Sequence, residues 1–285
     1  MTITERRAPR AGQVSAPRAG QVNAPRASEE RARTGPVAPV FKRPTWWVQV
    51  VIIVGFAWAY DEVRSLHGNV VAAGLHHGRA VLHLDKTLHV NWSEPMNHWL
   101  THHDWMADIL SGYYVVMHLG MTALTLLVLW LNGPRYRYHR NVLILLSLVG
   151  LGVYWIYPTA PPRLIGAGFH DTVAATLPFA YRVETASANL YAAVPSLHMA
   201  WALWVAIAIW SITSRWYVRV LAALHPVATA VTVLATGNHY TTDLLSGLAL
   251  TCAGYLIYAL GVRVLPPPRS DGTETLPAPR RTAGS

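Results

Sequence analysis

The stretch AVPSLHMAWALWVAIAIW, residues 193–210, sets a proline, a serine and a histidine directly before a long apolar run. Every residue from 199 to 210 is apolar. Such a run is typical of a segment buried in lipid, where no water is present to satisfy polar groups. Ser196 and His198 at its start therefore need polar partners, which we sought among the other polar clusters of the sequence.

The composition of the 285-residue chain also indicates a membrane protein. Charged residues make up only 13% of the chain, against about 25% in a typical soluble domain. The 12 Trp and 13 Tyr suit a protein with two lipid–water interfaces, where amphipathic rings collect. A net charge of +9 is also typical of nucleic-acid-binding proteins. The arginines, however, lie mainly in the tails and short connections, so we predict a lipid bilayer, and no nucleic acid, as the partner.

The N-terminal region and the single cysteine narrow the class further. Residues 8–27 read APRAGQVSAPRAGQVNAPRA, a repeat that cannot bury a core and predicts a disordered, solvated tail. Residues 1–44 have no apolar core before a cleavage site, so we expect no signal peptide. Cys252 is the only cysteine, which excludes an intrachain disulfide and a cysteine-cluster metal site.

Six segments approach the length and apolar character of a membrane span. They are residues 46–63, 107–131, 141–157, 197–213, 217–236 and 241–262. Residues 66–104, between the first two, have the mixed periodicity of helices that lie on the membrane surface. We therefore predict an all-α integral membrane bundle of six helices with interfacial helices over 45–264, and disordered cytoplasmic tails at 1–44 and 265–285.

The basic residues predict the orientation of this bundle. With the N-terminus inside, the outer segments carry only five of the 23 Lys and Arg residues. These five are Arg64, Arg79, Lys86, Arg163 and Arg182. An excess of basic residues inside is the rule for membrane proteins. We therefore expect both termini in the cytoplasm, and the 158–196 loop and the 237–240 turn together on the outer face of the plasma membrane.

Polar clusters at this face combine into one candidate site. His239 and Asp243 are four residues apart and share a helix face, where a carboxylate fixes the tautomer of the imidazole; a structural hydrogen bond between helices is the alternative. Ser196 suits a helix N-cap or an anion site. His198 is placed to donate a proton, or is an interfacial polar residue. Arg163, after two prolines, suits a phosphate or a lipid headgroup.

Together, one cation, a helix N-terminus and two histidines are what phosphoryl transfer through a phosphohistidine needs. Three motifs resemble those of the type 2 phosphatidic acid phosphatase superfamily, and more closely the branch that includes the inositol phosphorylceramide synthases and many bacterial relatives. They are YPTAPPRL at 157–164, PSLH at 195–198 and GNHYTTDLLSG at 237–247. The resemblance covers roughly 45–262 and is specific in the last two motifs. It implies a six-helix membrane core with the three motifs on one face.

The resemblance assigns a role to each candidate residue. It implies that His239 is the nucleophile that takes the phosphoryl group and that Asp243 orients it. His198 resembles the general acid that protonates the leaving oxygen and later acts as base. Arg163 and Ser196 resemble residues that hold the phosphate. The family needs no metal, so no metal and no cofactor is expected.

The sequence departs from the phosphatases proper at two positions. The second motif reads Ser-Leu-His in place of Ser-Gly-His, which is the form of the synthase-like branch. Val233 stands six residues before His239, where the phosphatases carry an Arg. One phosphate contact is then missing, for which Arg163 or Asn238 would substitute. Both departures favour a transferase.

Further polar residues allow structural and functional interpretations. The histidines of residues 66–104 suggest a zinc site, but no H-E-x-x-H motif accompanies them. His118 and Tyr113, in the second predicted span, either face the headgroup pocket or fill a helix interface. Asp171 is expected to order the 158–194 loop, which is long enough to cover the site or to contact a headgroup.

Three functions remain open from the sequence. The first is a membrane-embedded lipid phosphate phosphatase or phosphotransferase that acts on a lipid phosphate or phospholipid. The second is an intramembrane serine protease that uses Ser196. The third is a non-catalytic membrane protein that binds lipid phosphate. The oligomeric state is not predicted.

Overall fold

The computed structural model describes residues 45–65, 70–179 and 190–264, which belong to one unit, Lys42–Ser285. The tails predicted for 1–44 and 265–285 lie outside the described residues. The described chain is helical, and a single parallel bridge between Thr159 and Ala192 is its one element of β-pairing.

Six long helices coincide with the six predicted spans. They are α2 (Trp46–Ser65), α5 (Asp104–Asn132), α6 (Tyr136–Ile156), α9 (Leu197–Ile212), α10 (Trp216–Ala235) and α11 (Thr241–Val264). Four of the described helices, α5, α6, α10 and α11, are long and apolar enough to cross a membrane. The apolar helix α9 has 16 residues, a length of about 24 Å, and is shorter than a bilayer core of about 30 Å. The predicted all-α integral membrane bundle is confirmed.

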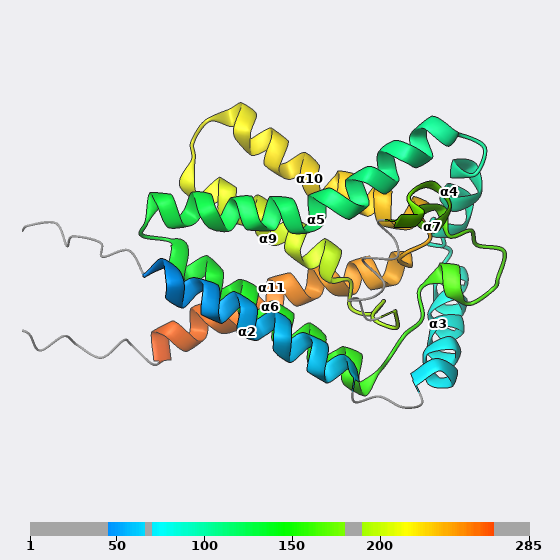
Figure 1. Cartoon of the computed structure of the whole chain (residues 1–285), viewed down its shortest axis with the longest axis horizontal. Helices are drawn as coiled ribbons and strands as arrows, with labels where there is room; N and C mark the ends of the chain where they lie inside the picture. Colours follow the sequence, from blue (N-terminus) through cyan, green and yellow to red (C-terminus); the bar gives the residue numbers. More distant parts are fainter. Residues whose placement is uncertain (1–44, 66–69, 180–189, 265–285) are drawn as a thin grey trace, which may run out of the picture. The chain divides into compact units, whose positions relative to one another are not determined.

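α9 lies at the centre of the bundle. It packs against α5, α6, α10 and α11, and Figure 1 shows it between α5 on one side and α6 with α11 on the other. Trp204 in its middle is fully buried, and its indole N–H donates to the carbonyl of His139 at 2.8 Å. Large apolar side chains such as Val116 and Leu248 are exposed on the outer faces of the bundle. This distribution is expected of helices that face lipid.

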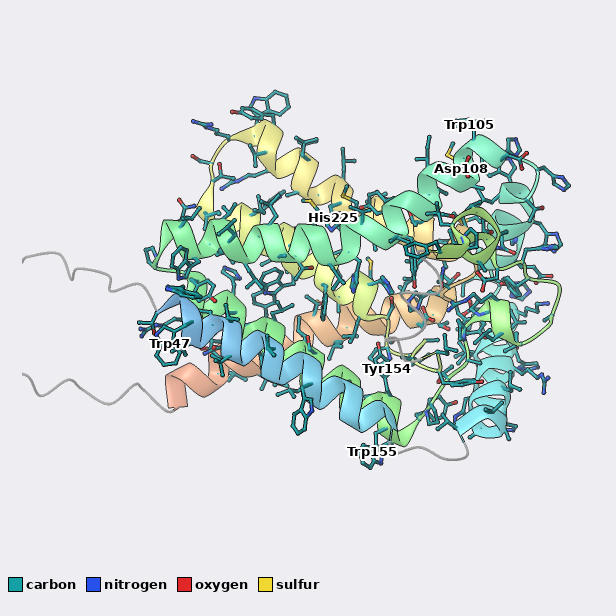
Figure 2. The ribbon with its side chains drawn as sticks, viewed as in Figure 1. Trp47, Trp105, Asp108, Tyr154, Trp155 and His225 are labelled. Carbon is teal, nitrogen blue, oxygen red and sulfur yellow. The ribbon has the colours of Figure 1, made fainter. Side chains whose placement is uncertain are left out.

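Tryptophans lie at the ends of the long helices. Trp47 and Trp105 are the second residues of α2 and α5, Trp155 is the last but one of α6, and each of the three is exposed. Figure 2 shows these side chains pointing away from the bundle. Amphipathic rings at helix ends are typical of anchors at a lipid–water interface.

The remaining described helices gather at the end of the bundle where α11 begins (Figure 1). They are α3 (Val70–Thr87), α4 (Ser93–Leu100), the 3₁₀ turn η1 (Pro162–Leu164) and α7 (Thr172–Thr176). α3 and α4 are the two helices expected within residues 66–104. Their position on the membrane surface remains a prediction.

The predicted orientation can be tested with two single cysteines in a Cys252→Ala background, because Cys252 is exposed. Ala167 lies between η1 and α7, Asn132 ends α5, and both are exposed. In intact cells we expect a membrane-impermeant maleimide to label Ala167→Cys and to spare Asn132→Cys until the cells are lysed. Labelling of Asn132→Cys alone would reverse the orientation.

Candidate active site

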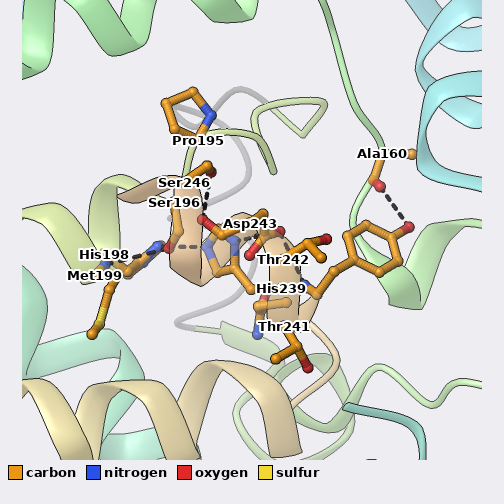
Figure 3. Close-up of polar contacts among 12 residues, drawn as sticks. Ala160, Pro195, Ser196, His198, Met199, His239, Thr241, Thr242, Asp243 and Ser246 are labelled. Atoms are coloured by element: carbon orange, nitrogen blue, oxygen red, sulfur yellow. Dashed lines mark hydrogen bonds and ion pairs between the residues drawn. The ribbon is translucent and has the colours of Figure 1, made fainter. Parts of the chain in front are cut away.

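A chain of two hydrogen bonds joins three of the predicted site residues (Figure 3). The Nδ1 atom of His198 lies 3.0 Å from Nε2 of His239. The Nδ1 atom of His239 lies 3.1 Å from Oδ2 of Asp243. His239 and Asp243 are both buried. The structure therefore brings together residues that lie up to 45 positions apart in the sequence.

The start of α11 fixes this geometry. His239 lies just before the helix and Asp243 lies in its first turn. Oδ2 of Asp243 also accepts a hydrogen bond from the backbone N–H of Tyr240 at 3.0 Å. A carboxylate can only accept, so His239 donates from Nδ1–H and keeps a lone pair on Nε2. The Nε2 atom is the nitrogen that faces His198.

The surroundings of His239 keep its imidazole neutral. Burial, together with the nearby charge of Arg163, lowers the pKa of His239 from its ordinary value. A neutral imidazole retains the lone pair that a nucleophile needs. The ring is therefore in the reactive form at neutral pH.

Ser196 caps α9. Its hydroxyl accepts a hydrogen bond from the backbone N–H of Met199 at 3.3 Å, and its own N–H donates to the carbonyl of Asp243 at 3.2 Å. A side chain on Gly247 would prevent this contact between helices, because a Cβ there would lie 2.4 Å from the carbonyl oxygen of Ser196. The N-cap interpretation of Ser196 is confirmed, and its contact with phosphate remains a prediction.

The structure does not link Ser196 to a catalytic base. Both ring nitrogens of His239 have other partners, His198 and Asp243. A serine protease needs its base in contact with the serine hydroxyl. The geometry therefore disfavours the protease interpretation.

Arg163 lies beside Asn238 at the turn between α10 and α11. Its backbone N–H donates to the carbonyl of Gly237 at 3.0 Å, a turn that the positive φ of Gly237, 73°, makes possible. Its guanidinium donates to Oδ1 of Asn238, and its Nε atom lies 3.2 Å from Oδ2 of Asp171. The two residues expected to replace the missing phosphate contact are thus neighbours.

Val233 has a structural role in place of the absent Arg. Its side chain is buried with Tyr114, Val173 and Leu244. Its carbonyl accepts from the backbone N–H groups of Asn238 and His239, at 2.9 and 3.1 Å. Val233 therefore supports the turn that carries His239 through its backbone carbonyl.

Sequence reasoning missed Asp85, which caps α11 from α3. Its side chain is fully buried, and its two oxygens accept from the backbone N–H groups of Thr241 and Thr242 at 2.8 and 3.0 Å. A carboxylate at a helix N-terminus satisfies otherwise free donors and the positive end of the dipole. The only sequence signal was a single Asp directly after the apolar and basic run of residues 70–84.

Two further residues connect α4 and the loop after α6 to the site. Asn97 of α4 is fully buried and donates to the carbonyls of His170 and Ala235 at 3.0 and 2.8 Å. The hydroxyl of Tyr240 donates to the carbonyl of Ala160 at 2.9 Å. Asp171 caps α7 by accepting from the backbone N–H of Ala174 at 3.0 Å. That it orders the whole 158–194 loop stays a prediction, because residues 180–189 lie outside the described residues.

The remaining polar residues are also placed. His67 of the zinc hypothesis lies outside the described residues, and within the described ranges no three His, Cys, Asp or Glu side chains cluster as metal ligands. The ring of His118 lies 4.1 Å from that of His198, measured between centroids. The hydroxyl of Tyr113 lies 2.7 Å from Nδ1 of His225 on α10. His118 thus borders the site, and Tyr113 fills a helix interface.

The cap at Asp85 predicts a measurable contribution to stability. Asp85→Ala leaves two buried backbone N–H groups without acceptors, so we expect a loss of about 1–2 kcal/mol in the free energy of unfolding. Asp85→Asn keeps one acceptor oxygen and should lose less. Asp108→Ala is the matched control, because Asp108 is exposed on α5 (Figure 2). Equal midpoints for Asp85→Ala and Asp108→Ala in thermal unfolding in detergent would contradict the cap.

Comparison with known proteins agrees with this geometry. The PAP2 superfamily matches residues 79–257. A phosphoinositol dihydroceramide synthase of Bacteroides thetaiotaomicron is 28% identical over 188 residues, which are 59% of this chain and 61% of that protein. The chain thus aligns with less than two thirds of that relative's length. No solved structure matches. The family match spans more than half of the chain and contains the whole His198–His239–Asp243 chain, so this protein belongs to the PAP2 superfamily.

Proposed function

We propose that the protein is a membrane-embedded enzyme that transfers a phosphoryl group or a phospho-headgroup from a lipid through a phosphohistidine on His239. The observation that carries this proposal is the buried chain from His198 through His239 to Asp243, with hydrogen bonds of 3.0 and 3.1 Å. It supplies a nucleophile, a group that orients it and an acid on the opposite side. A protein that only binds lipid phosphate needs the cation Arg163 but not this chain.

In the first half-reaction, Nε2 of His239 attacks the phosphorus of the lipid. The new N–P bond forms as the bond from phosphorus to the leaving oxygen breaks. His198, in its imidazolium form, gives its proton to that oxygen, and the negative charge of the substrate phosphate favours this form. Asp243 keeps its hydrogen bond to Nδ1–H and stabilises the positive charge that develops on the ring.

In the second half-reaction, a hydroxyl group attacks the phosphohistidine. The now neutral His198 takes the hydroxyl proton, the new O–P bond forms and the N–P bond breaks. His239 recovers its lone pair and His198 its proton, so the side chains complete the cycle without a metal ion. Water as acceptor makes the enzyme a phosphatase, and a lipid alcohol makes it a transferase.

We assign the phosphate contacts to Arg163, Asn238 and the N-terminal end of α9 at Ser196. The guanidinium of Arg163 lies beside Asn238 and Asp171, and a guanidinium can hold a phosphate by two parallel hydrogen bonds. The N-terminus of a helix adds the positive end of its dipole. Arg163 and Asn238 would together replace the Arg that is absent at Val233.

The similarity to the Bacteroides synthase favours a transferase over a phosphatase. Val233 in place of Arg and the Ser-Leu-His sequence at 196–198 point the same way. We infer that the acceptor is a long-chain alcohol of the ceramide class, because the name of that relative gives phosphoinositol dihydroceramide as its product. The site is proposed to face the outside of the plasma membrane.

Trapping the intermediate tests this proposal and separates its two forms. His198→Ala removes the acid and base but keeps the nucleophile, so a donor whose leaving group needs no proton should accumulate the acid-labile phosphohistidine. We expect mass spectrometry to find the adduct on His239 and to find none in His239→Ala/His198→Ala. An adduct that carries the donor headgroup indicates that a phospho-headgroup is transferred, and a bare adduct indicates that only the phosphoryl group is transferred. The product formed with water or with a lipid alcohol then separates a phosphatase from a transferase.

Turnover gives the second arm of this test. In nanodiscs, His239→Ala should abolish product formation, and His198→Ala should lower it by roughly 10²–10⁴-fold with natural leaving groups. The opposite result is an unmodified chain that binds lipid phosphate but forms no adduct and no product with glycerophospholipids or ceramide-class lipids. That result would support a non-catalytic binder.

A further inference from the structure

A small pocket with mainly apolar walls and a few polar groups lies between α5, α9 and α10, next to the proposed active site. Its polar lining comes from Tyr113, His118, His198, Thr229 and Thr232. Its volume is about 10 Å³, about the space that one water molecule or one hydroxyl group needs. The lining contains no Lys or Arg, so the pocket does not suit the phosphate itself.

Hydrogen-bonding groups in this pocket are left unused by the described chain. The hydroxyl of Thr232 is buried and has no hydrogen-bond partner. The described residues offer His118 only ring contacts, with His198 and with Trp201. His198 uses Nδ1 for His239, and its Nε2 makes no hydrogen bond within the described part of the chain. A polar group without a hydrogen-bond partner inside a membrane protein costs free energy, so the pocket suits a polar ligand group.

Neighbouring contacts hold the walls of the pocket in place. The hydroxyl of Tyr113 lies 2.7 Å from Nδ1 of His225 and 3.3 Å from the hydroxyl of Thr229, and Figure 2 shows His225 between α10 and α5. The ring of His118 stacks on Trp201 with a centroid distance of 4.7 Å. A ligand group in the pocket would therefore contact side chains that are already oriented.

His198 borders both this pocket and the nucleophile. One edge of its ring meets His239, and the ring also lines the pocket beside His118. A molecule in the pocket would thus be in contact with the residue that acts as base in the second half-reaction.

We propose that this pocket binds the hydroxyl group of the acceptor, an alcohol R–OH, and that Thr232 and His118 position it against His198. The inference rests on the proposed function. A hydroxyl both donates and accepts, which matches an imidazole nitrogen and the Thr232 hydroxyl. In the reaction its proton passes to neutral His198, its oxygen bonds to phosphorus and the N–P bond to His239 breaks. A lipid alcohol and water are the two sources of such a hydroxyl.

Thr232→Val tests the pocket with little change in shape. The lost hydroxyl has no partner in the protein, so the thermal midpoint should not fall. We expect the KM for a short-chain dihydroceramide to rise about 3- to 10-fold, the loss of one neutral hydrogen bond. The rate of adduct formation on His239 should stay unchanged, and Thr232→Ser should restore the KM. Thr251→Val is the control, because Thr251 is a buried threonine of α11 outside the pocket.

The same variants separate the two sources of the hydroxyl. If the pocket takes a lipid alcohol, Thr232→Val changes transfer to dihydroceramide and leaves hydrolysis of the adduct unchanged. If it takes water, hydrolysis of the adduct slows and the KM for dihydroceramide stays the same. An unchanged second half-reaction with both acceptors, or an equal slowing of adduct formation, would overturn the proposal.

A binding experiment keeps this test independent of turnover. A photoreactive dihydroceramide should label α5 or α10 peptides, dihydroceramide should compete, and its 1-O-methyl ether should compete less because it cannot donate. His118→Phe, which keeps a ring against Trp201, should reduce the labelling. Failure of adduct formation together with hydroxyl-dependent labelling would refute the enzyme but retain the pocket. Equal competition by the alcohol and the ether, with acceptor saturation unchanged in Thr232→Val, would refute the pocket.

Discussion

The contact between the first turns of α9 and α11 organises the site. The backbone N–H of Ser196 meets the carbonyl of Asp243 at 3.2 Å, and His198 meets His239 within the same contact at 3.0 Å. Two helix N-termini that approach each other place two positive dipole ends together. Two buried carboxylates, Asp85 and Asp243, offset this field, and a phosphate is the kind of ligand that such a place attracts.

Helices α3 and α4 are part of the structure around the candidate active site. α3 contributes Asp85, which holds the first turn of α11. α4 contributes Asn97, which joins the end of α10 to the loop that follows η1. The His239 turn is thus fixed from outside the six long helices. The family match begins within α3, at residue 79, which is consistent with a role of α3 in the site.

The sequence predicted the helices well because membrane spans have a strong signal. Long apolar runs placed all six long helices within a few residues, and α6 differs most, since it begins at Tyr136 in place of residue 141. Short polar spacing placed His239, Asp243, His198 and Arg163 at one end of the bundle. Asp85 and Asn97 were missed because their partners are backbone groups 73 or more positions away. No local pattern encodes such contacts, and the pocket at Thr232 was missed for the same reason.

The stereochemical course at phosphorus tests the central claim most directly. The measurement follows a donor lipid with a phosphorothioate of known configuration through one turnover to the lipid product. Two in-line displacements, first by His239 and then by the acceptor hydroxyl, invert the phosphorus twice. The account therefore predicts overall retention of configuration. Overall inversion would mean that the acceptor attacks the donor directly, and it would contradict a covalent intermediate on His239.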